Sequence, residues 1–158
     1  YNQSVYIRIT GGANNPIIYN KDYNFEIGKP IKLMDGKDIT IFANGAIVDE
    51  ALKAAQILKE KNIDCSVVNV HTLKPLENKL FKEFIINKKL IVSLEEHNVI
   101  GGLGSSISDI MSTFTHSTKL LKIGINDNYN FHGDYEHLKK KYKLQADQVA
   151  ESIMSNYK

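Results

Sequence analysis

The stretch that decides the fold is Glu95-Glu96-His97-Asn98-Val99-Ile100-Gly101-Gly102-Leu103-Gly104-Ser105-Ser106. An apolar run at 90–94 precedes it. A helical pattern follows it, because Leu103, Ile107 and Ile110 recur at the spacing of one helix face. The glycine-rich turn therefore joins the end of a strand to the start of a helix. In open α/β sheets, ligands and partner surfaces gather at such junctions.

Strand and helix patterns alternate on both sides of this stretch. Nearly continuous apolar runs predict parallel strands that are buried on both faces. Amphipathic patterns between them predict helices long enough for right-handed crossovers. The expected strands span 39–43, 65–70, 90–94 and 120–125, and the expected helices span 46–61, 78–86, 102–114, 135–142 and 146–154.

A fifth strand is expected at 31–34. The turn residues Asp35-Gly36-Lys37 separate it from 39–43, which predicts a hairpin and makes 31–34 an antiparallel edge strand. The fold class is therefore α/β: a three-layer sandwich around a mostly parallel five-stranded sheet with one antiparallel edge strand. The β-branched and aromatic run Val5-Tyr6-Ile7-Arg8-Ile9 predicts a further short strand near the start of the chain.

The length and composition of the chain limit the classes of protein to which it can belong. The 158 residues suffice for one domain with a core, and the net charge of +2 gives no electrostatic footprint for nucleic acid. No apolar run approaches the roughly 18 residues that a membrane span needs. The single cysteine, Cys65, excludes an intrachain disulfide and favours a cytoplasmic chain. Because the chain begins at Tyr1 rather than Met, we expect a fragment or a processed product.

Polar residues collect at the edge where the parallel strands end. His71 follows one strand there, and Glu95, Glu96 and His97 follow another. These residue types suit zinc, but they come from different loops and lack a ligand spacing such as His-Glu-x-x-His. Loop histidines bonded to carboxylates or to the backbone are the more common arrangement.

A dinucleotide site is the second interpretation of the central turn. Gly102-Leu103-Gly104 follows a strand and opens a helix, and Asp127 follows the next strand. However, Ile107 holds the third glycine position, and the segment from Leu94 to Gly102 is too long for a tight phosphate loop. The favoured interpretation is that these glycines allow close approach of helix and strand.

Two other residues are candidates for chemistry. Cys65 lies at the start of a strand, away from the polar edge, so a buried small hydrophobe is favoured over a nucleophile. A serine nucleophile has less support, because no Gly-x-Ser-x-Gly elbow occurs. Arg8 ends a strand pattern before a glycine-rich loop, where it could hold a phosphate or carboxylate or form an ordinary ion pair.

Three segments together resemble one family. They are 38–45 with its helix, the loop Val70-His71-Thr72-Leu73-Lys74-Pro75-Leu76, and 95–105. The chain resembles the C-terminal portion of a transketolase, and in particular the C-terminal subunit of the split transketolases. The alternatives are two relatives that share the fold, deoxyxylulose-phosphate synthase and the 2-oxoacid dehydrogenase beta subunit, and a stand-alone nucleotide-binding α/β module.

The resemblance implies an enzyme that uses thiamine diphosphate and Mg²⁺ to move a two-carbon ketol unit between sugar phosphates. In this family the cofactor lies between two other domains, one of which carries a Gly-Asp-Gly metal motif that is absent here. We therefore expect residues 1–36 to be the tail of a pyrimidine-binding domain with a linker and edge strand, and 37–158 to be the C-terminal domain. We expect no catalytic residue, metal or cofactor in this chain alone.

The resemblance also implies partners and contact residues. The partners are the remaining transketolase domains or an N-terminal subunit, in a homodimer or a split heterotetramer. In relatives the segment around Arg8 often reads Ile-Arg-x-x-Arg-Gly and is associated with substrate phosphate. Arg8 matches the first arginine, but Gly11 replaces the second. The candidates for an interface or cleft are His71, Glu95, Glu96, His97, Gly101, Gly102 and Gly104.

Overall fold

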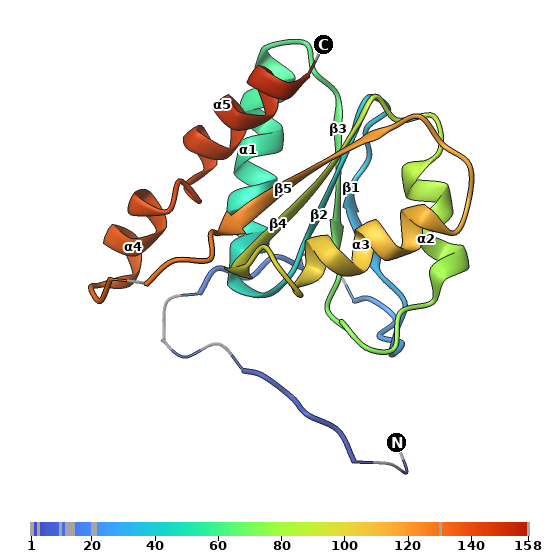
Figure 1. The fold of residues 1–158 in the computed structure, drawn as a ribbon, viewed down its shortest axis with the longest axis horizontal. Coiled ribbons are helices and arrows are strands. Elements are labelled where there is room, and N and C mark those ends of the chain that lie inside the picture. The colour runs from blue at the N-terminus through green and yellow to red at the C-terminus, as the bar shows by residue number, and fades with distance from the viewer. Residues whose placement is uncertain are drawn as a thin grey trace.

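The chain forms one mixed sheet with helices on both faces (Figure 1). The structure is a computed structural model that describes residues 2, 4–9, 11, 15–19, 22–129 and 131–157. The elements are β1 (Ile31–Met34), β2 (Ile39–Ala43), η1 (Gly45–Ile47), α1 (Val48–Glu60), β3 (Cys65–Asn69), α2 (Asn78–Ile85), β4 (Leu90–Asn98), α3 (Leu103–Ser112), β5 (Lys119–Ile125), α4 (Tyr135–Lys141) and α5 (Ala146–Asn156). The predicted three-layer α/β class is confirmed.

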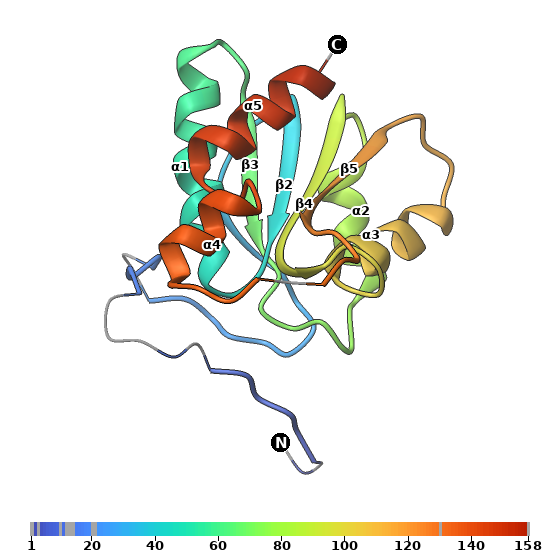
Figure 2. The ribbon, with the colours of Figure 1, turned by 60° about the vertical axis from the view of Figure 1, so that its left-hand side comes forward.

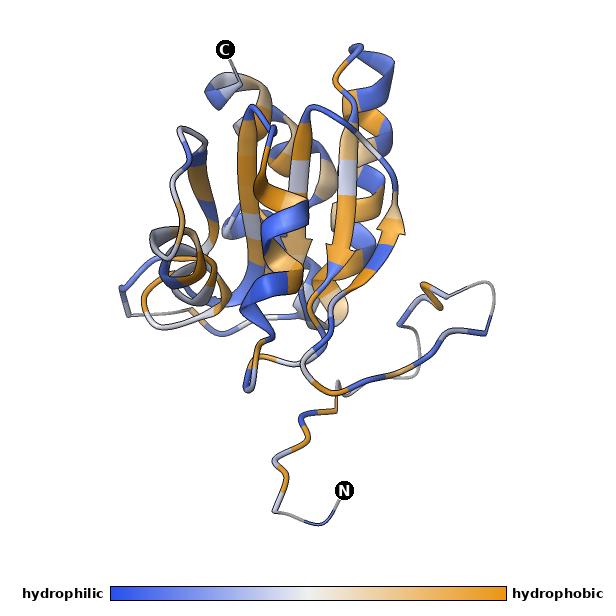
Figure 3. Cartoon of the chain, turned by 90° about the vertical axis from the view of Figure 1, so that its right-hand side faces the viewer, coloured by the Kyte–Doolittle hydropathy of each residue, from blue (hydrophilic) through white to orange (hydrophobic). Residues whose placement is uncertain are grey.

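Strand β2 is the centre of the sheet, whose order is β1-β3-β2-β4-β5. It pairs in parallel with β3 on one side and with β4 on the other, so that Ala43 lies opposite both Asn69 and Leu94. All five residues of β2 are buried, which explains why its sequence is apolar apart from Thr40, whose hydroxyl is hydrogen-bonded to Ser66 and to the Phe84 carbonyl. Figure 3 shows the same apolar character along the neighbouring strands.

Two apolar cores lie on the two faces of the sheet. Alternate residues of β2 point to opposite faces, so Ile41 joins the core under α1 and α5 while Phe42 joins the core under α2 and α3. Figure 2 shows α1, α4 and α5 together on one face. This arrangement brings the ends of β2, β3, β4 and β5 to a single edge, which we call the carboxyl edge.

The predicted hairpin between β1 and β2 is wrong. β1 instead pairs antiparallel with β3, with Ile31 opposite Asn69, and it remains the antiparallel edge strand. Both sides of β2 are already occupied by β3 and β4. The turn after β1 crosses tightly over the start of β3, since a Cβ on Gly36 would lie 2.1 Å from the carbonyl carbon of Cys65.

The predicted strand in the first residues is also wrong. Residues 4–9 run as an irregular segment away from the body at the carboxyl edge (Figure 1), and Tyr6 is 90% and Ile7 73% exposed. A β-branched run forms a strand only beside another backbone, and the described part of the chain offers it none. Within that part, every helix is too short or too polar to cross a bilayer.

Candidate functional site at the carboxyl edge

The carboxyl edge is formed by the strand ends and by the starts of α1, α2 and α3. The structure places His71 there, just after β3, together with the central stretch after β4. β4 continues to Asn98, so Glu95, Glu96 and His97 belong to the strand and not to a loop. Because β2 lies between β3 and β4, His71 and the central stretch occupy separate parts of the edge.

The Glu95 side chain is an internal cap for α3. It is 1% exposed, and its two carboxylate oxygens accept hydrogen bonds from the backbone N–H groups of Leu103 at 2.6 Å and Gly104 at 2.9 Å. A helix N-terminus attracts anions because its first N–H groups lack partners within the helix. Glu95 therefore fills the position that a phosphate would take in a nucleotide-binding turn, and the expectation that it faces another domain is corrected.

Two of the glycines are required by the close packing of α3 on the sheet. A Cβ on Gly102 would lie 2.0 Å from Oε2 of Glu95, and a Cβ on Gly104 would lie 2.6 Å from Oγ of Ser93. Gly101 has a different role, because its φ of +80° is a conformation that other residues rarely adopt. The glycine-rich turn thus serves the close approach of α3 to β4, as the favoured interpretation predicted.

Glu96 connects β4 to the C-terminal helices. Its carboxylate accepts a hydrogen bond from the Tyr135 hydroxyl at the start of α4. Burial, together with this bond to a carboxylate, raises the pKa of Tyr135. The Lys139 ammonium lies 4.9 Å from the centre of the Tyr135 ring, a favourable cation–π distance.

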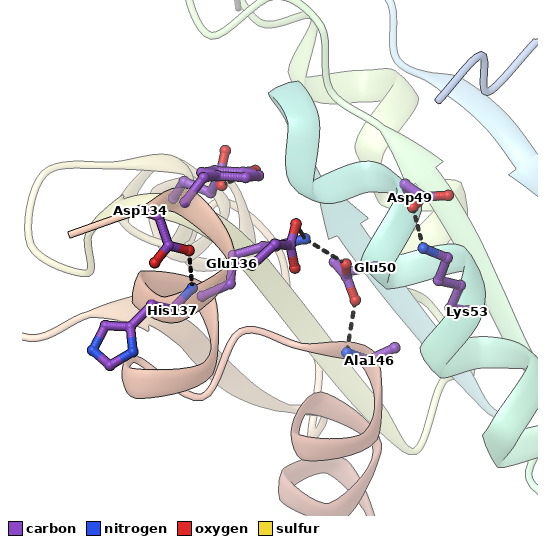
Figure 4. A network of polar contacts seen from close by, with 10 residues as sticks. Asp49, Glu50, Lys53, Asp134, Glu136, His137 and Ala146 are labelled. Atoms are coloured by element: carbon purple, nitrogen blue, oxygen red, sulfur yellow. Dashed lines mark hydrogen bonds and ion pairs between the residues drawn. The ribbon is translucent and has the colours of Figure 1, made fainter. Parts of the chain in front are cut away.

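Lys139 continues this network to α1. Its ammonium contacts Glu50 at 2.8 Å and Glu136 at 2.9 Å, while the second oxygen of Glu50 accepts the backbone N–H of Ala146 at 2.8 Å. Figure 4 shows Glu50 of α1 facing α4 and the first residue of α5. Burial alone would lower the pKa of Lys139, but its hydrogen bonds to the two carboxylates raise it on balance.

Within the lysine-rich segment 139–143, one lysine side chain is buried. Lys139 is 9% exposed, whereas the neighbouring Lys140 and Lys141 are exposed. The sequence signal for this difference is weak, since a buried lysine needs a carboxylate partner that lies 89 residues away along the chain. The network holds α4 and α5 against α1 and β4.

His71 lies beside an aromatic ring and is half-buried. Its Nδ1 is 2.8 Å from Oγ1 of Thr72, and its ring centre is 4.5 Å from that of Phe25. Burial lowers the pKa of His71, and a backbone contact with Lys29 opposes this effect. The lowered pKa favours the neutral form of the imidazole.

His97 and Cys65 are placed far from any shared catalytic arrangement. His97 is exposed on β4, and the described residues contain no group of three His, Cys, Asp or Glu side chains that could hold a metal ion. Cys65 is buried at the opposite edge, where burial raises the pKa of its thiol to about 12. The interpretation of Cys65 as a small buried hydrophobe is confirmed.

Arg8 lies in the exposed segment 4–9. Its side chain makes no hydrogen bond or ion pair with the described residues. The structure therefore brings together the residues around the α3 cap, but it leaves Arg8 and His71 apart from them.

The chain is therefore a three-layer α/β domain in which the helix after the glycine-rich turn, α3, is capped by Glu95 of the same chain. A family model for the transketolase C-terminal domain matches residues 28–149. The chain belongs to this family.

Similar proteins support the same assignment. A chain from Methanocaldococcus jannaschii named as a transketolase C-terminal section is 38% identical over 160 residues, which cover 100% of this chain and 49% of that protein. A subunit of an apulose-4-phosphate transketolase from Actinobacillus succinogenes is 34% identical, covering 96% of this chain and 49% of the relative. A 1-deoxy-D-xylulose-5-phosphate synthase from Caldanaerobacter subterraneus is also 34% identical, but only 25% of it is covered.

Solved structures agree with the sequence relatives. A split-gene transketolase, described as an inactive tetramer, superimposes with a TM-score of 0.79 at 34% identity, covering 89% of this chain and 46% of that one. The transketolase of Campylobacter jejuni gives a TM-score of 0.60 at 19% identity, covering 81% of this chain and 18% of that one, and shares the fold. The chain thus spans about half the length of the transketolase subunits that it matches.

Proposed function

We propose that this chain is the C-terminal domain of a thiamine-diphosphate-dependent transketolase, which moves a two-carbon ketol unit between sugar phosphates or related sugars. The observation that carries the proposal is the family match over residues 28–149, together with the relatives that align along nearly the whole chain. The domain supplies packing surface to the catalytic domains and to the dimer interface, and by itself it is not catalytic.

The residues of this chain do not fit the cofactor. A diphosphate needs free N–H donors or cations, but the N–H groups at the start of α3 are taken by Glu95. The sequence also lacks the Gly-Asp-Gly motif associated with the Mg²⁺ ion in this family. We therefore assign thiamine diphosphate and Mg²⁺ to the other domains of the enzyme.

The same proposal divides the chain. Residues 1–36 join the preceding pyrimidine-binding domain through a linker and edge strand, and 37–158 form the C-terminal domain. The exposed apolar side chains at 5–9 support this division, because a partner sheet would cover them. The partners are the remaining domains or an N-terminal subunit, in a homodimer or a split heterotetramer. The free, buried thiol of Cys65 favours the cytoplasm as the compartment.

Arg8 is assigned to the substrate phosphate in the full enzyme. Its exposure in this chain leaves the guanidinium available for such a contact. We expect Arg8→Ala to raise the KM for a phosphorylated substrate about 10- to 100-fold, the worth of one charge-assisted contact. The measurement is steady-state kinetics with phosphorylated and unphosphorylated donors. An equal rise in KM for both donors would contradict a contact between Arg8 and the phosphate.

The division of labour is tested by comparing the 158-residue chain with the full enzyme. Ketol transfer from a ketose phosphate to an aldose phosphate should require the full enzyme, and calorimetry should detect thiamine diphosphate binding only there. Micromolar binding of thiamine diphosphate to the 158-residue chain would overturn the proposal.

The similarity to deoxyxylulose-phosphate synthases supports a second candidate reaction. The same assay separates the two, because a transketolase accepts a ketose donor whereas the synthase would require pyruvate. Turnover with pyruvate and none with ketose donors would assign the chain to the synthase group.

A further inference from the structure

A cavity of about 260 Å³ lies at the amino edge, which is the edge of the sheet where the parallel strands begin. The turn after β1 lines it with Gly36, the last turn of α2 with Phe84, and the start of β3 with Ser66. Pockets for drug-sized ligands usually measure about 300–1,000 Å³, so this cavity is suited only to a small molecule. It is separate from the α3 cap and from His71, which lie at the carboxyl edge.

Lys88 brings a primary amine to the wall of this cavity. The half-buried ammonium donates a hydrogen bond to the Gly36 carbonyl, a neutral acceptor. Among the residues that the structure describes, no carboxylate forms an ion pair with it. Its backbone is fixed, because the N–H donates to the Ile85 carbonyl and the C=O accepts the Thr118 hydroxyl at 2.9 Å. The amine is therefore held in a defined place.

The charges that face Lys88 come from several elements. Burial is the largest influence and lowers the pKa of Lys88. Three carboxylates from the segments just before β3 and β2 and just after β1 oppose this effect: Asp64, Asp38 and Asp35. The Lys32 ammonium acts in the same direction as burial, and Glu83 of α2 adds a further carboxylate to the cavity wall. On balance the pKa of Lys88 is lowered, which enlarges the neutral fraction of its amine.

The next residue, Lys89, has the opposite environment. Its side chain is 59% exposed, and its ammonium contacts the Asp38 carboxylate at 2.9 Å and the Tyr157 hydroxyl at 3.0 Å. The hydrogen bond to Asp38 raises the pKa of Lys89. The neutral amine is the form that attacks an electrophile, so burial activates Lys88 whereas an ion pair protects Lys89.

We propose that Lys88 is a site of acylation by small acyl phosphates, which reach its amine through the amino-edge cavity. The Nζ amine forms a C–N bond with the acyl carbonyl carbon, and the bond from that carbon to the phosphate oxygen breaks. Inorganic phosphate leaves with the electron pair of that bond, and the amine loses a proton to solvent. Acyl phosphates are suited to the cavity because both the acyl group and the leaving group are compact.

Selectivity for Lys88 arises from the reactivity of its amine and from the size of the cavity. The lining carries two ammonium groups and two carboxylates, which gives no net attraction for an anion: Lys32, Lys88, Asp35 and Glu83. The product fits the same place, because an amide keeps one N–H for the Gly36 carbonyl while the acyl group lies in the cavity beside Phe84. The inference goes beyond the proposed function and does not depend on it.

Peptide mass spectrometry measures the rate of acylation at each lysine. The 158-residue chain is incubated near pH 7 with isotopically labelled acetyl phosphate, and fragment ions distinguish position 88 from position 89. We expect Lys88 to be acetylated several-fold faster than Lys89 and than the exposed Lys140, although Lys88 is the least exposed of the three. A rate at Lys88 equal to or below that at Lys89 would overturn the proposal.

A bulky acyl donor tests the role of the cavity. The N-hydroxysuccinimide ester of biotin carries an acyl group too large for it, so this reagent should label Lys89 and Lys140 faster than Lys88. The order found with acetyl phosphate would then be reversed. Preferential labelling of Lys88 by both donors would contradict selection of small donors by the cavity.

Matched variants check the assignment. Lys88→Arg keeps a donor for the Gly36 carbonyl but removes the primary amine, so the fast label should disappear while the Tm changes little. Lys89→Arg is the control and should leave the rate at Lys88 unchanged. Fast labelling of this peptide that survives Lys88→Arg would refute the proposal. If Lys88→Arg did not fold, the rates in the unsubstituted chain would still decide.

Discussion

The two edges of the sheet differ in how far the chain satisfies its own polar groups. At the amino edge, Asp38 pairs with Lys89 at 2.9 Å and accepts the backbone N–H of Asp64, and the Lys89 ammonium also donates to the Tyr157 hydroxyl at 3.0 Å. The hydrogen bond to Lys89 lowers the pKa of Asp38. Among the residues that the structure describes, the carboxyl edge leaves three buried polar atoms without a hydrogen-bond partner: Oδ1 of Asn44, Oδ1 of Asn69 and Nε2 of His71.

The difference between the two edges is one of degree, because one buried nitrogen near the amino edge, Nδ1 of His116, also lacks a partner among the described residues. The amino edge ties together the start of β2, the start of β4 and the end of α5, all within this chain. At the carboxyl edge, the α3 end is complete because Glu95 caps it, whereas the ends of β2 and β3 are not.

The largest expected effect comes from Glu95→Ala, which removes the cap at the N-terminus of α3. The substitution removes two charge-assisted hydrogen bonds and leaves two N–H groups buried, so the free energy of unfolding should fall by about 4 kcal/mol. Urea denaturation of the 158-residue chain measures it. Asp38→Ala, which removes a partly exposed ion pair at the amino edge, is the comparison and should cost about 1 kcal/mol. Equal losses would mean that the α3 cap is no stronger than a surface pair.

Lys139→Met comes next in size. It leaves the Glu50 carboxylate buried with only the Ala146 N–H as partner, and the expected loss is about 3 kcal/mol. Lys140→Met, at the neighbouring exposed position, should change the free energy of unfolding by less than about 0.5 kcal/mol. Thermal and urea unfolding of the two variants measure these losses. Small losses for both would show that the network around Lys139 does not stabilise the fold.

Gly102→Ala should cost about 2 kcal/mol, because its Cβ would collide with the Glu95 carboxylate and displace it from the cap. Gly101→Ala has open space around the new Cβ and should cost about 1 kcal/mol, the strain of its positive φ. Chemical denaturation compares the two. A larger loss for Gly101→Ala would show that backbone conformation outweighs the close approach to Glu95.

The smallest expected effect is a pH dependence of stability that comes from His71. Burial lowers the pKa of His71, so below about pH 6.5 the unfolded chain binds more protons than the folded one. The His71 contribution to stability is therefore present above about pH 6.5 and is lost as the pH falls through the folded-state pKa. His71→Phe should reduce the fall in Tm between about pH 7 and pH 5. An unchanged fall would assign the pH dependence to other groups.

Much of the fold was predictable from periodicity. The runs at 39–43, 65–70 and 90–94 were correctly assigned as buried strands, because each lies between two neighbours and two helix layers. The partner of β1 was not predictable from the Asp35-Gly36-Lys37 turn. Turn chemistry shows that the chain reverses, but the occupied sides of β2 decide which strand it meets.

The candidate site was predicted less well for a related reason. Glu95, Glu96 and His97 look like loop residues because they are polar, yet they continue β4. Glu95 is buried only because the N–H groups of α3 compensate its charge, and this contact is formed by the fold. Likewise, nothing in the order of residues shows that Oδ1 of Asn69 and Nε2 of His71 lack a hydrogen-bond partner among the described residues.

The N-terminus of α3, where Glu95 accepts the first N–H groups, has the geometry of an anion-binding site. With the Glu95 side chain cut back to alanine, two aligned N–H donors would face a small enclosed space bounded by glycines. A free carboxylate of the right size, such as acetate or formate, has the shape and charge of the group removed. Added acetate or formate should therefore restore part of the stability that Glu95→Ala removes.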